Sequence, residues 1–335
     1  MFVYLARRFL LLIPTLFGIT LITFVLINLA PGGPVEQKIQ QMRMGGDGGG
    51  GRSMGVVNQQ VLDALKKQYG FDKPLHMRYL IWLKNIVHMD FGDSFVYEEP
   101  VVDVIKSKFP VSLQFGIVSL ILTYSVCIPL GIRKAIKVGS RFDQVSTVIL
   151  NATYAIPTLV MGIYLITVFS GKLNWFPVGN LYSDDYESLT TGGKIWDRVH
   201  HFVLPTICYM MGGFTELTVL MKNSMLDVIK TDYVRTARAK GLDEKIIQYK
   251  HALRNALIPI ATGIGGFLGV FLTGSILIET VFNLDGIGLL SYKSVLQRDY
   301  NVIMGLTFLS SVALMFGRIL SDVIYVLVDP RIDFK

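Results

Sequence analysis

The chain has 335 residues and a formal net charge of +7, and 51% of its residues are hydrophobic whereas only 17% are charged. Soluble domains carry roughly 25% charged residues, so this composition excludes an ordinary soluble domain and indicates a membrane protein. The two cysteines, Cys127 and Cys208, lie in apolar runs, which argues against a disulfide framework and favours buried packing.

The first apolar run covers residues 9–30, follows Arg7 and Arg8, and is long enough to cross the hydrocarbon core of a membrane. A cleaved signal peptide is the alternative. The run exceeds the roughly 7–15 residues of a signal-peptide core, and no small-residue cleavage site precedes Pro31. A retained transmembrane helix is therefore favoured.

Five further apolar runs follow, at residues 111–132, 145–170, 202–221, 256–278 and 302–328. Together with the first run they predict an all-α polytopic membrane protein with six transmembrane helices. Prolines and glycines in these runs predict bends and close helix contacts, as at Pro157 and at Gly265 with Gly269.

Basic residues gather on one side of this six-span topology: Arg7, Arg8, Arg133, Lys134, Lys137, Arg141, those of 222–259, Arg331 and Lys335. Lysine and arginine accumulate in cytoplasmic loops, so this side is predicted to be cytoplasmic, with both termini inside. The membrane is expected to be the bacterial inner membrane.

The first external segment is predicted to span residues 31–110. Its glycine-rich stretch at 45–51 is typical of a flexible linker. Helical spacing then predicts two amphipathic helices, one at 61–69 and one opened by Pro74 that carries Leu75, Tyr79, Trp82, Leu83 and Ile86. Packing on lipid or on the spans is favoured, and a cover over the entrance of the bundle is the alternative.

The expected domain organisation has four parts. They are the N-terminus with the first span (1–30), the external segment (31–110), a five-helix core with a cytoplasmic loop at 222–259 (111–328), and a cytoplasmic tail (329–335).

Three charged residues lie inside predicted spans: Glu216, Arg318 and Asp322. Intramembrane charges are costly unless paired, so they form a candidate polar site. At 1.5 Å per residue Glu216 and Arg318 reach similar depth, which predicts that they face each other or share a cavity. The alternatives are that Arg318 pairs only with Asp322, and that Glu216 faces a pore.

Residues 222–259 form a polar, basic stretch between two apolar runs. Asp232 and Asp243 are candidate N-caps of two short helices, and Gly241 between them suits a left-handed helix end. Two capped helices at a fixed angle make a rigid projection that can carry a push from a partner. A solvated connector whose charges only set topology is the alternative.

The same stretch resembles the EAA loop of bacterial ABC importer permeases. The resemblance lies in Arg235-Thr236-Ala237, then Gly241 after three residues, then His251-Ala252-Leu253. Three positions depart from the general motif: Arg235 replaces glutamate, His251 replaces an apolar residue, and Arg254 replaces proline. DYVRTARAKGL and HALRNALIP are similar to the dipeptide and oligopeptide permease family.

The resemblance to this family covers nearly the whole chain. It is carried by APGGPV, YGFDKP, DFGDS, PLGIRKA, GSRFD, MKNSMLD, FLTGS, LDGIGLL, RDY and LVDPRIDF. It implies the type I ABC importer permease fold and inward transport of peptides or peptide-like compounds such as microcin C. It also implies three partners: a second homologous permease, cytoplasmic ATPase subunits and an external substrate-binding protein.

The resemblance assigns the residues that couple the permease to its ATPase. They are Asp232, Arg235, Thr236, Ala237, Lys240, Gly241, His251 and Arg254. Acids of the external loops, Asp184, Asp185, Glu187, Asp285 and Asp299, are candidates for docking the binding protein, or are ordinary solvated charges.

No catalytic or metal-binding motif is present in the sequence. HExxH and GxSxG are missing, and the Walker A pattern fails because Lys172 precedes leucine and Lys194 precedes isoleucine. We expect no enzyme activity and no cofactor in this chain, with ATP and Mg bound by a partner ATPase. A secondary transporter and a non-transporting structural subunit are the alternative functions.

Overall fold

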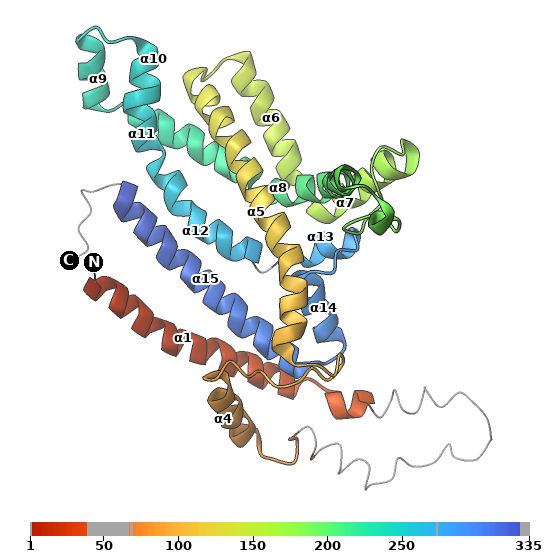
Figure 1. The fold of residues 1–335 in the computed structure, drawn as a ribbon. Coiled ribbons are helices and arrows are strands. Elements are labelled where there is room, and N and C mark those ends of the chain that lie inside the picture. The colour runs from red at the N-terminus through yellow and green to blue at the C-terminus, as the bar shows by residue number, and fades with distance from the viewer. Residues whose placement is uncertain (1, 39–66, 68–69, 273, 329–335) are drawn as a thin grey trace. The chain divides into compact units, whose positions relative to one another are not determined.

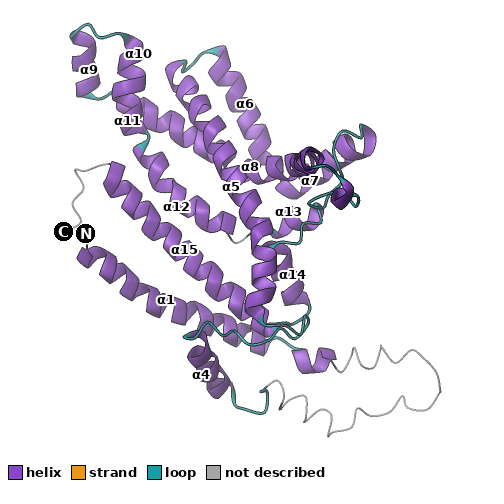
Figure 2. Ribbon diagram, in the orientation of Figure 1, coloured by secondary structure: helices purple, strands orange, loops and turns teal. Residues whose placement is uncertain are grey.

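The computed structural model describes residues 2–38, 67, 70–272 and 274–328. Within these residues it is built from helices and contains no strand (Figures 1 and 2). The helices are α1 (Phe2–Leu29), α4 (Leu75–Ile86), α5 (Val101–Ile136), α6 (Arg141–Ala155), α7 (Thr158–Leu165), η1 (Ile166–Lys172), η2 (Tyr186–Ser188), α8 (Thr191–Ile229), α9 (Asp232–Ala239), α10 (Glu244–Ile246), η3 (Ile247–Ala252), α11 (Leu253–Ala256), α12 (Ile258–Leu272), α13 (Ile276–Val281), α14 (Ile287–Leu296) and α15 (Tyr300–Val328). The all-α prediction is confirmed.

Four helices among the described residues are long and apolar enough to cross a membrane, and they match four of the six predicted runs. They contain Arg7–Leu29, Val101–Ile136, Thr191–Ile229 and Tyr300–Ile324. A bent pair, Arg141–Ala155 with Thr158–Lys172, supplies a fifth. The remaining predicted run, residues 256–278, is divided among α11, α12 and α13, so no single helix covers it.

The bend between α6 and α7 has a local cause in Pro157. The two helices meet at 96°. Proline cannot donate a backbone hydrogen bond and disfavours a helical conformation in the residue before it. Ile156 accordingly adopts φ −85° and ψ 120° and ends α6, and Pro157 becomes the N-cap of α7. The run at 145–170 is therefore one bent element and not one straight helix.

Helix contacts divide the chain into two compact units. Unit 1 comprises Met1–Arg8, Pro110–Leu289 and Ala313–Lys335, and unit 2 comprises Phe9–Phe109 and Leu290–Val312. Each unit has its own apolar core, and each is described separately below.

Unit 1 buries two apolar clusters along α8. One joins α8 to α5, α7 and α13 through Cys208, Phe115, Leu165 and Ile278. The other is centred on Met221 and also includes Cys127, Leu217, Ala256 and Ile260. Both cysteines are free and buried, which confirms the packing role expected from the sequence.

The glycine-based packing of α12 is confirmed at Gly265. A Cβ atom placed there would lie 1.8 Å from the carbonyl oxygen of Gly317 in α15, so no side chain fits between the two backbones. Close approach of this kind is the usual role of small residues in membrane helices.

Unit 2 packs α4 against α1. Tyr79 and Ile86 of α4 are buried, and Tyr79 contacts Phe24 of α1 and Met304 of α15. The Tyr79 hydroxyl lies 2.9 Å from the Thr20 hydroxyl and donates to the Phe17 carbonyl. The predicted amphipathic helix therefore exists and packs on a span. The linker at 45–51, the helix at 61–69 and the tail at 329–335 fall outside the described residues.

Candidate functional site

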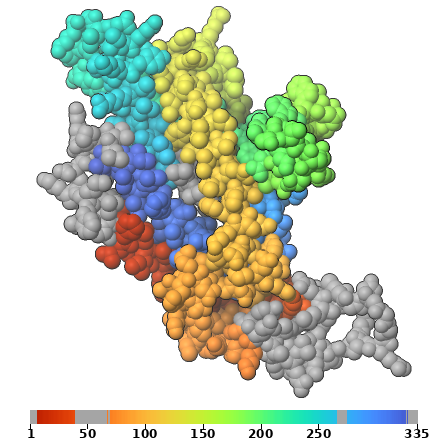
Figure 3. Space-filling view, in the orientation of Figure 1, coloured from red at the N-terminus to blue at the C-terminus, as the bar shows by residue number. Residues whose placement is uncertain are grey.

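The stretch at 222–259 folds into the helix pair that the sequence predicts. It contains the end of α8, then α9, a turn at Gly241, and α10, η3 and α11 in direct succession (Figure 1). The space-filling view shows α9 and α10, in teal, as a knob on the surface (Figure 3). We call residues 231–256 the coupling loop.

One predicted cap is confirmed and the other is corrected. The Asp243 carboxylate accepts a hydrogen bond from the Lys245 amide and caps α10. Asp232 is instead the first residue of α9, and the N-cap is Thr231. An acid in the first turn still interacts favourably with the positive end of the helix dipole.

Gly241 turns the chain between α9 and α10 in a left-handed conformation, with φ +77°. Its amide donates to the Arg238 carbonyl at 2.9 Å, which ends α9. A Cβ atom at Gly241 would meet no atom within 4 Å. Backbone conformation alone, and not lack of space, requires glycine here.

Three contacts across the turn hold the two halves of the coupling loop together. First, α9 packs against η3, and Val234 and Ile247, one from each helix, are fully buried. The Asn255 amide donates to the Tyr233 hydroxyl at 2.7 Å. These residues escaped the sequence reasoning, although an apolar pair within a polar stretch is a recognisable signal.

The third contact is an ion pair between Arg238 and Glu244. The guanidinium Nε and Nη2 donate to the two carboxylate oxygens of Glu244 at 3.0 and 2.5 Å. This hydrogen-bonded pairing lowers the pKa of Glu244 and raises that of Arg238. A two-pronged contact fixes orientation as well as distance, so it holds α10 in a defined orientation against α9.

Most of the predicted coupling residues lie on the surface of this loop. Asp232, Arg235, Thr236, Lys240, Gly241 and Arg254 are exposed, whereas Ala237 and His251 are half-buried. Arg235 lies 3.5 Å from Asp232 in a solvent-exposed pair, which contributes little to stability. The structure thus gathers these residues on one rigid element where a partner can reach them.

A buried charge cluster that was not predicted from the sequence joins α5 and α6 to the part of α8 that precedes the coupling loop. Asp143 of α6 lies between two lysines: Lys134 of α5 at 3.1 Å and Lys222 of α8 at 2.7 Å. The Lys134 side chain is only 1% exposed, and its ammonium also donates to Ser146 and Thr147. The cluster thereby fastens the α5–α6 turn to the end of α8 that leads into the coupling loop.

A second buried carboxylate, Glu279, organises the segment between α12 and α14. It is 0% exposed and accepts hydrogen bonds from Ser112 and Tyr209 and from the amides of Ser275 and Leu289. Every one of these donors is neutral. Glu279 directly follows the predicted apolar run at residues 256–278, and no role was predicted for it.

Glycines make room for the Glu279 carboxylate. A Cβ atom at Gly274 would lie 2.5 Å from its Oε1, and one at Gly286 would lie 2.7 Å from its Oε2. Gly274 also has φ +73°. The chain therefore wraps closely around the carboxylate, which explains the concentration of glycine in this stretch.

The structure does not form the direct pair predicted for Glu216 and Arg318, and the shared cavity stays a prediction. Both side chains are exposed, and within the described part of the chain they form no ion pair. Asp322 pairs with Arg8 and not with Arg318. Rise per residue estimates the depth of a group along a helix but not the direction in which its side chain points, and direction decides the pairing.

The docking acids divide into two groups. Asp184, Asp185, Glu187 and Asp285 are exposed, as a docking role requires. Asp299 must be corrected, because its side chain is buried and accepts hydrogen bonds from Ser94 and from the Val302 amide at the start of α15. Asp299 is a structural link within unit 2.

Replacing Asp143 by asparagine is expected to destabilise the protein by about 3 kcal/mol, because it leaves a buried lysine without its counter-charge. The shift is measured as the midpoint of thermal unfolding in detergent. Asp103→Asn is the matched control, since Asp103 forms only an exposed pair with Lys106. Equal midpoints for the two variants would contradict the structural role of the cluster.

Replacing Glu279 by glutamine keeps the side-chain shape but turns one acceptor atom into a donor. At least one of the four donors then loses its acceptor, at a cost of about 1–3 kcal/mol. Unfolding in detergent checks this, with Glu187→Gln as a control because the Glu187 side chain is 89% exposed. Unchanged stability of the Glu279 variant would show that the hydrogen bonds do not hold this segment.

Comparison with known proteins agrees with the geometry. Residues 127–334 match the family described as "Binding-protein-dependent transport system inner membrane component". One relative is the peptidoglycan transport system permease protein YejB of Agrobacterium fabrum, which is 42% identical over 99% of this chain and 98% of its own length. Another is the inner membrane ABC transporter permease protein YejB of Escherichia coli, which is 42% identical over 99% of each chain. The oligopeptide transport system permease AppB of Bacillus subtilis is 37% identical over 99% of each chain.

A solved structure shares the fold. The MetNI methionine ABC transporter in inward-facing conformations superposes with a TM-score of 0.51 at 15% identity, covering 68% of this chain and 97% of that one. Membership of the family implies ATPase partners and a substrate-binding protein, and ATP hydrolysis belongs to the ATPase. The chain belongs to the inner membrane components of binding-protein-dependent transport systems: it is a multi-pass permease subunit of an ABC importer and not itself an enzyme.

Proposed function

We propose that this chain forms one half of a heterodimeric pore that carries peptides or peptide-like compounds, microcin C among them, into the cell. The observation that supports it most strongly is similarity over 99% of the chain to permeases named for peptidoglycan and oligopeptide transport. The other half is a second permease of the same fold. The pathway for the peptide is then lined by residues from both chains.

The coupling loop is the element through which ATP drives the pore. ATP and Mg are bound by a cytoplasmic ATPase, whose closure moves the loop. Because the Arg238–Glu244 pair and the buried Val234 and Ile247 hold the loop rigid, the motion passes into α8 and α12 and is not absorbed locally. The Asp143 cluster then transmits it from α8 to α5 and α6.

The proposed topology places both termini and the coupling loop in the cytoplasm of a bacterium. The basic residues Arg133, Lys134 and Lys137 at the α5–α6 turn favour that side. Residues 31–110 are then external, residues 111–328 form the five-helix core, and residues 329–335 return to the cytoplasm. Asp184, Asp185, Glu187 and Asp285 are on the outer side, where they meet basic residues of the binding protein.

The test is reconstitution with and without the ATPase. Copurification of the permease pair with the ATPase, followed by peptide-stimulated ATP hydrolysis and uptake in proteoliposomes, is the expected result. Uptake of defined peptides and of microcin C then sets the substrate range. Uptake driven by an ion gradient without ATPase would reject the proposal in favour of a secondary transporter.

The Gly241 turn gives the sharpest test of coupling. Gly241→Val is expected to reduce ATP-driven uptake by at least about tenfold, because a β-branched residue resists positive φ. Gly241→Asn is the matched variant: asparagine tolerates this conformation, so uptake should stay within about twofold of wild type. Membrane insertion is checked for both. Equal uptake by the two variants would show that the turn geometry is not needed.

Reversing the charges of Asp184, Asp185 and Glu187 to lysine is expected to weaken binding-protein affinity at low salt, and less so at high salt because ions screen exposed charges. The measurement is binding of the purified binding protein to reconstituted permease. Asp103→Lys serves as a charge-reversal control. Unchanged affinity at low salt would leave these acids as ordinary solvated charges.

A further inference from the structure

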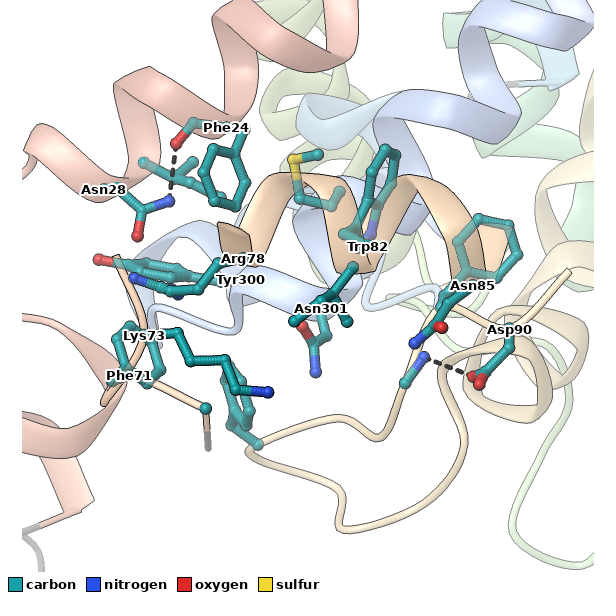
Figure 4. Close-up of a pocket in the computed structure, with 17 residues that line it drawn as sticks. Phe24, Asn28, Phe71, Lys73, Arg78, Trp82, Asn85, Asp90, Tyr300 and Asn301 are labelled. Carbon is teal, nitrogen blue, oxygen red and sulfur yellow. Dashed lines mark hydrogen bonds between the residues drawn. The ribbon is translucent and has the colours of Figure 1, made fainter. Parts of the chain in front are cut away.

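Unit 2 contains a pocket that has no part in the mechanism proposed above. It has a volume of about 230 Å³ and lies between the end of α1, the loop before α4, α4 itself and the start of α15 (Figure 4). Its wall is aromatic, with Phe24, Phe71, Trp82 and Phe95, and its polar lining includes Asn28, Lys73, Arg78, Asn85 and Asp90.

The charge of the pocket is positive and unbalanced. Arg78 and Lys73 both line it, and within the described residues neither forms an ion pair. The one acid of the lining, Asp90, already accepts a hydrogen bond from the Gly92 amide. With two cations and one carboxylate the lining keeps a net positive charge, and neither cation is in an ion pair within the described residues.

Arg78 is held in place by rings and not by an anion. Its guanidinium carbon lies 3.9 Å from the ring centre of Phe71 and 5.8 Å from that of Phe24. Burial lowers the pKa of Arg78, with the neighbouring Tyr300 acting in the opposite direction. A half-buried guanidinium that forms no ion pair within the described residues can bind an anion through charge-assisted hydrogen bonds.

Trp82 supplies a second unsatisfied donor. Its indole N–H is buried and has no hydrogen-bond acceptor within the described part of the chain. The ring is stacked on Tyr79 with centroids 6.0 Å apart, which limits its rotation. A buried tryptophan N–H normally finds a partner, so a ligand that brings an acceptor oxygen would satisfy it.

The position of the pocket along α1 indicates which ligand could bring an acceptor oxygen to Trp82. Phe24, Ile27 and Asn28 belong to the last turns of a helix that is a candidate span, so they lie at the level of the lipid headgroups. On the face of α1 that carries Phe24, two and three turns before it, Phe17 is 47% exposed and Ile13 is 66% exposed. An apolar surface for acyl chains thus runs directly up to a cationic pocket.

We infer that this pocket binds the phosphate of an anionic phospholipid, with the acyl chains lying along α1. The volume is below the roughly 300–1,000 Å³ of sites for drug-sized ligands, so a headgroup enters while the chains stay in the bilayer. A zwitterionic headgroup would bring its own cation next to Arg78 and Lys73, which disfavours it. Lipid binding at this pocket requires neither a particular substrate of the pore nor a particular leaflet of the membrane.

The fluorescence of Trp82 reports the bound lipid directly. The chain has three tryptophans, so Trp175→Phe with Trp196→Phe leaves Trp82 as the sole reporter in the full chain. This protein is reconstituted in phosphatidylcholine vesicles that contain equal mole fractions of acyl-brominated phosphatidylglycerol or acyl-brominated phosphatidylcholine. Bromine quenches indole fluorescence on contact, so quenching measures occupancy near Trp82.

Phosphatidylglycerol is expected to occupy the site about fivefold more strongly than phosphatidylcholine, the effect of one basic residue near an anionic lipid. Arg78→Gln should abolish the preference, and Arg78→Lys should keep most of it while showing that the fold is intact. Arg198→Gln, at an exposed arginine of unit 1, should leave the preference unchanged.

Three outcomes would overturn the inference. Equal quenching by the two brominated lipids would show no headgroup selection, and a preference that survives in Arg78→Gln would place the selection elsewhere. Equal quenching by the two lipids, combined with Trp82 fluorescence that responds to inorganic phosphate but not to chloride at equal ionic strength, would assign the pocket to free phosphate and not to lipid.

Discussion

The arrangement of α5, α6 and α8 next to the coupling loop depends on the ion pairs of the Asp143 carboxylate with Lys134 and Lys222. Two lysines from different helices reach it, and one of them, Lys134, is almost completely buried. A buried ammonium is stable only with a counter-charge and full hydrogen bonding, so α5, α6 and α8 are held in one arrangement. The backbone contributes too, since the Gly139 amide donates to the same carboxylate.

Glu279 solves a related problem without any cation. A loop inside a helical membrane protein leaves backbone amides that have no helical partner, and lipid cannot satisfy them. Here one carboxylate accepts from two such amides, at Ser275 and Leu289, and from the side chains of Ser112 and Tyr209. The interrupted segment between α12 and α14 is thereby tied to α5 and α8.

The coupling loop and the unit 2 pocket differ in whether their polar groups find partners. The coupling loop is internally fixed by the Arg238–Glu244 pair, while its outward residues are exposed to a partner. The unit 2 pocket has the opposite character, because its donors at Arg78 and Trp82 are positioned by aromatic rings but unsatisfied by the described chain.

The sequence by itself determined the helical class, the membrane location, the rigid helix pair at 222–259 and the left-handed glycine at 241. These follow from hydrophobic run length, capping residues and glycine chemistry, which are local properties. Only the tertiary structure decided which charges meet. Asp322 pairs with Arg8, Asp143 joins Lys134 and Lys222, and Asp299 is buried, because pairing depends on the direction of side chains from helices distant in sequence.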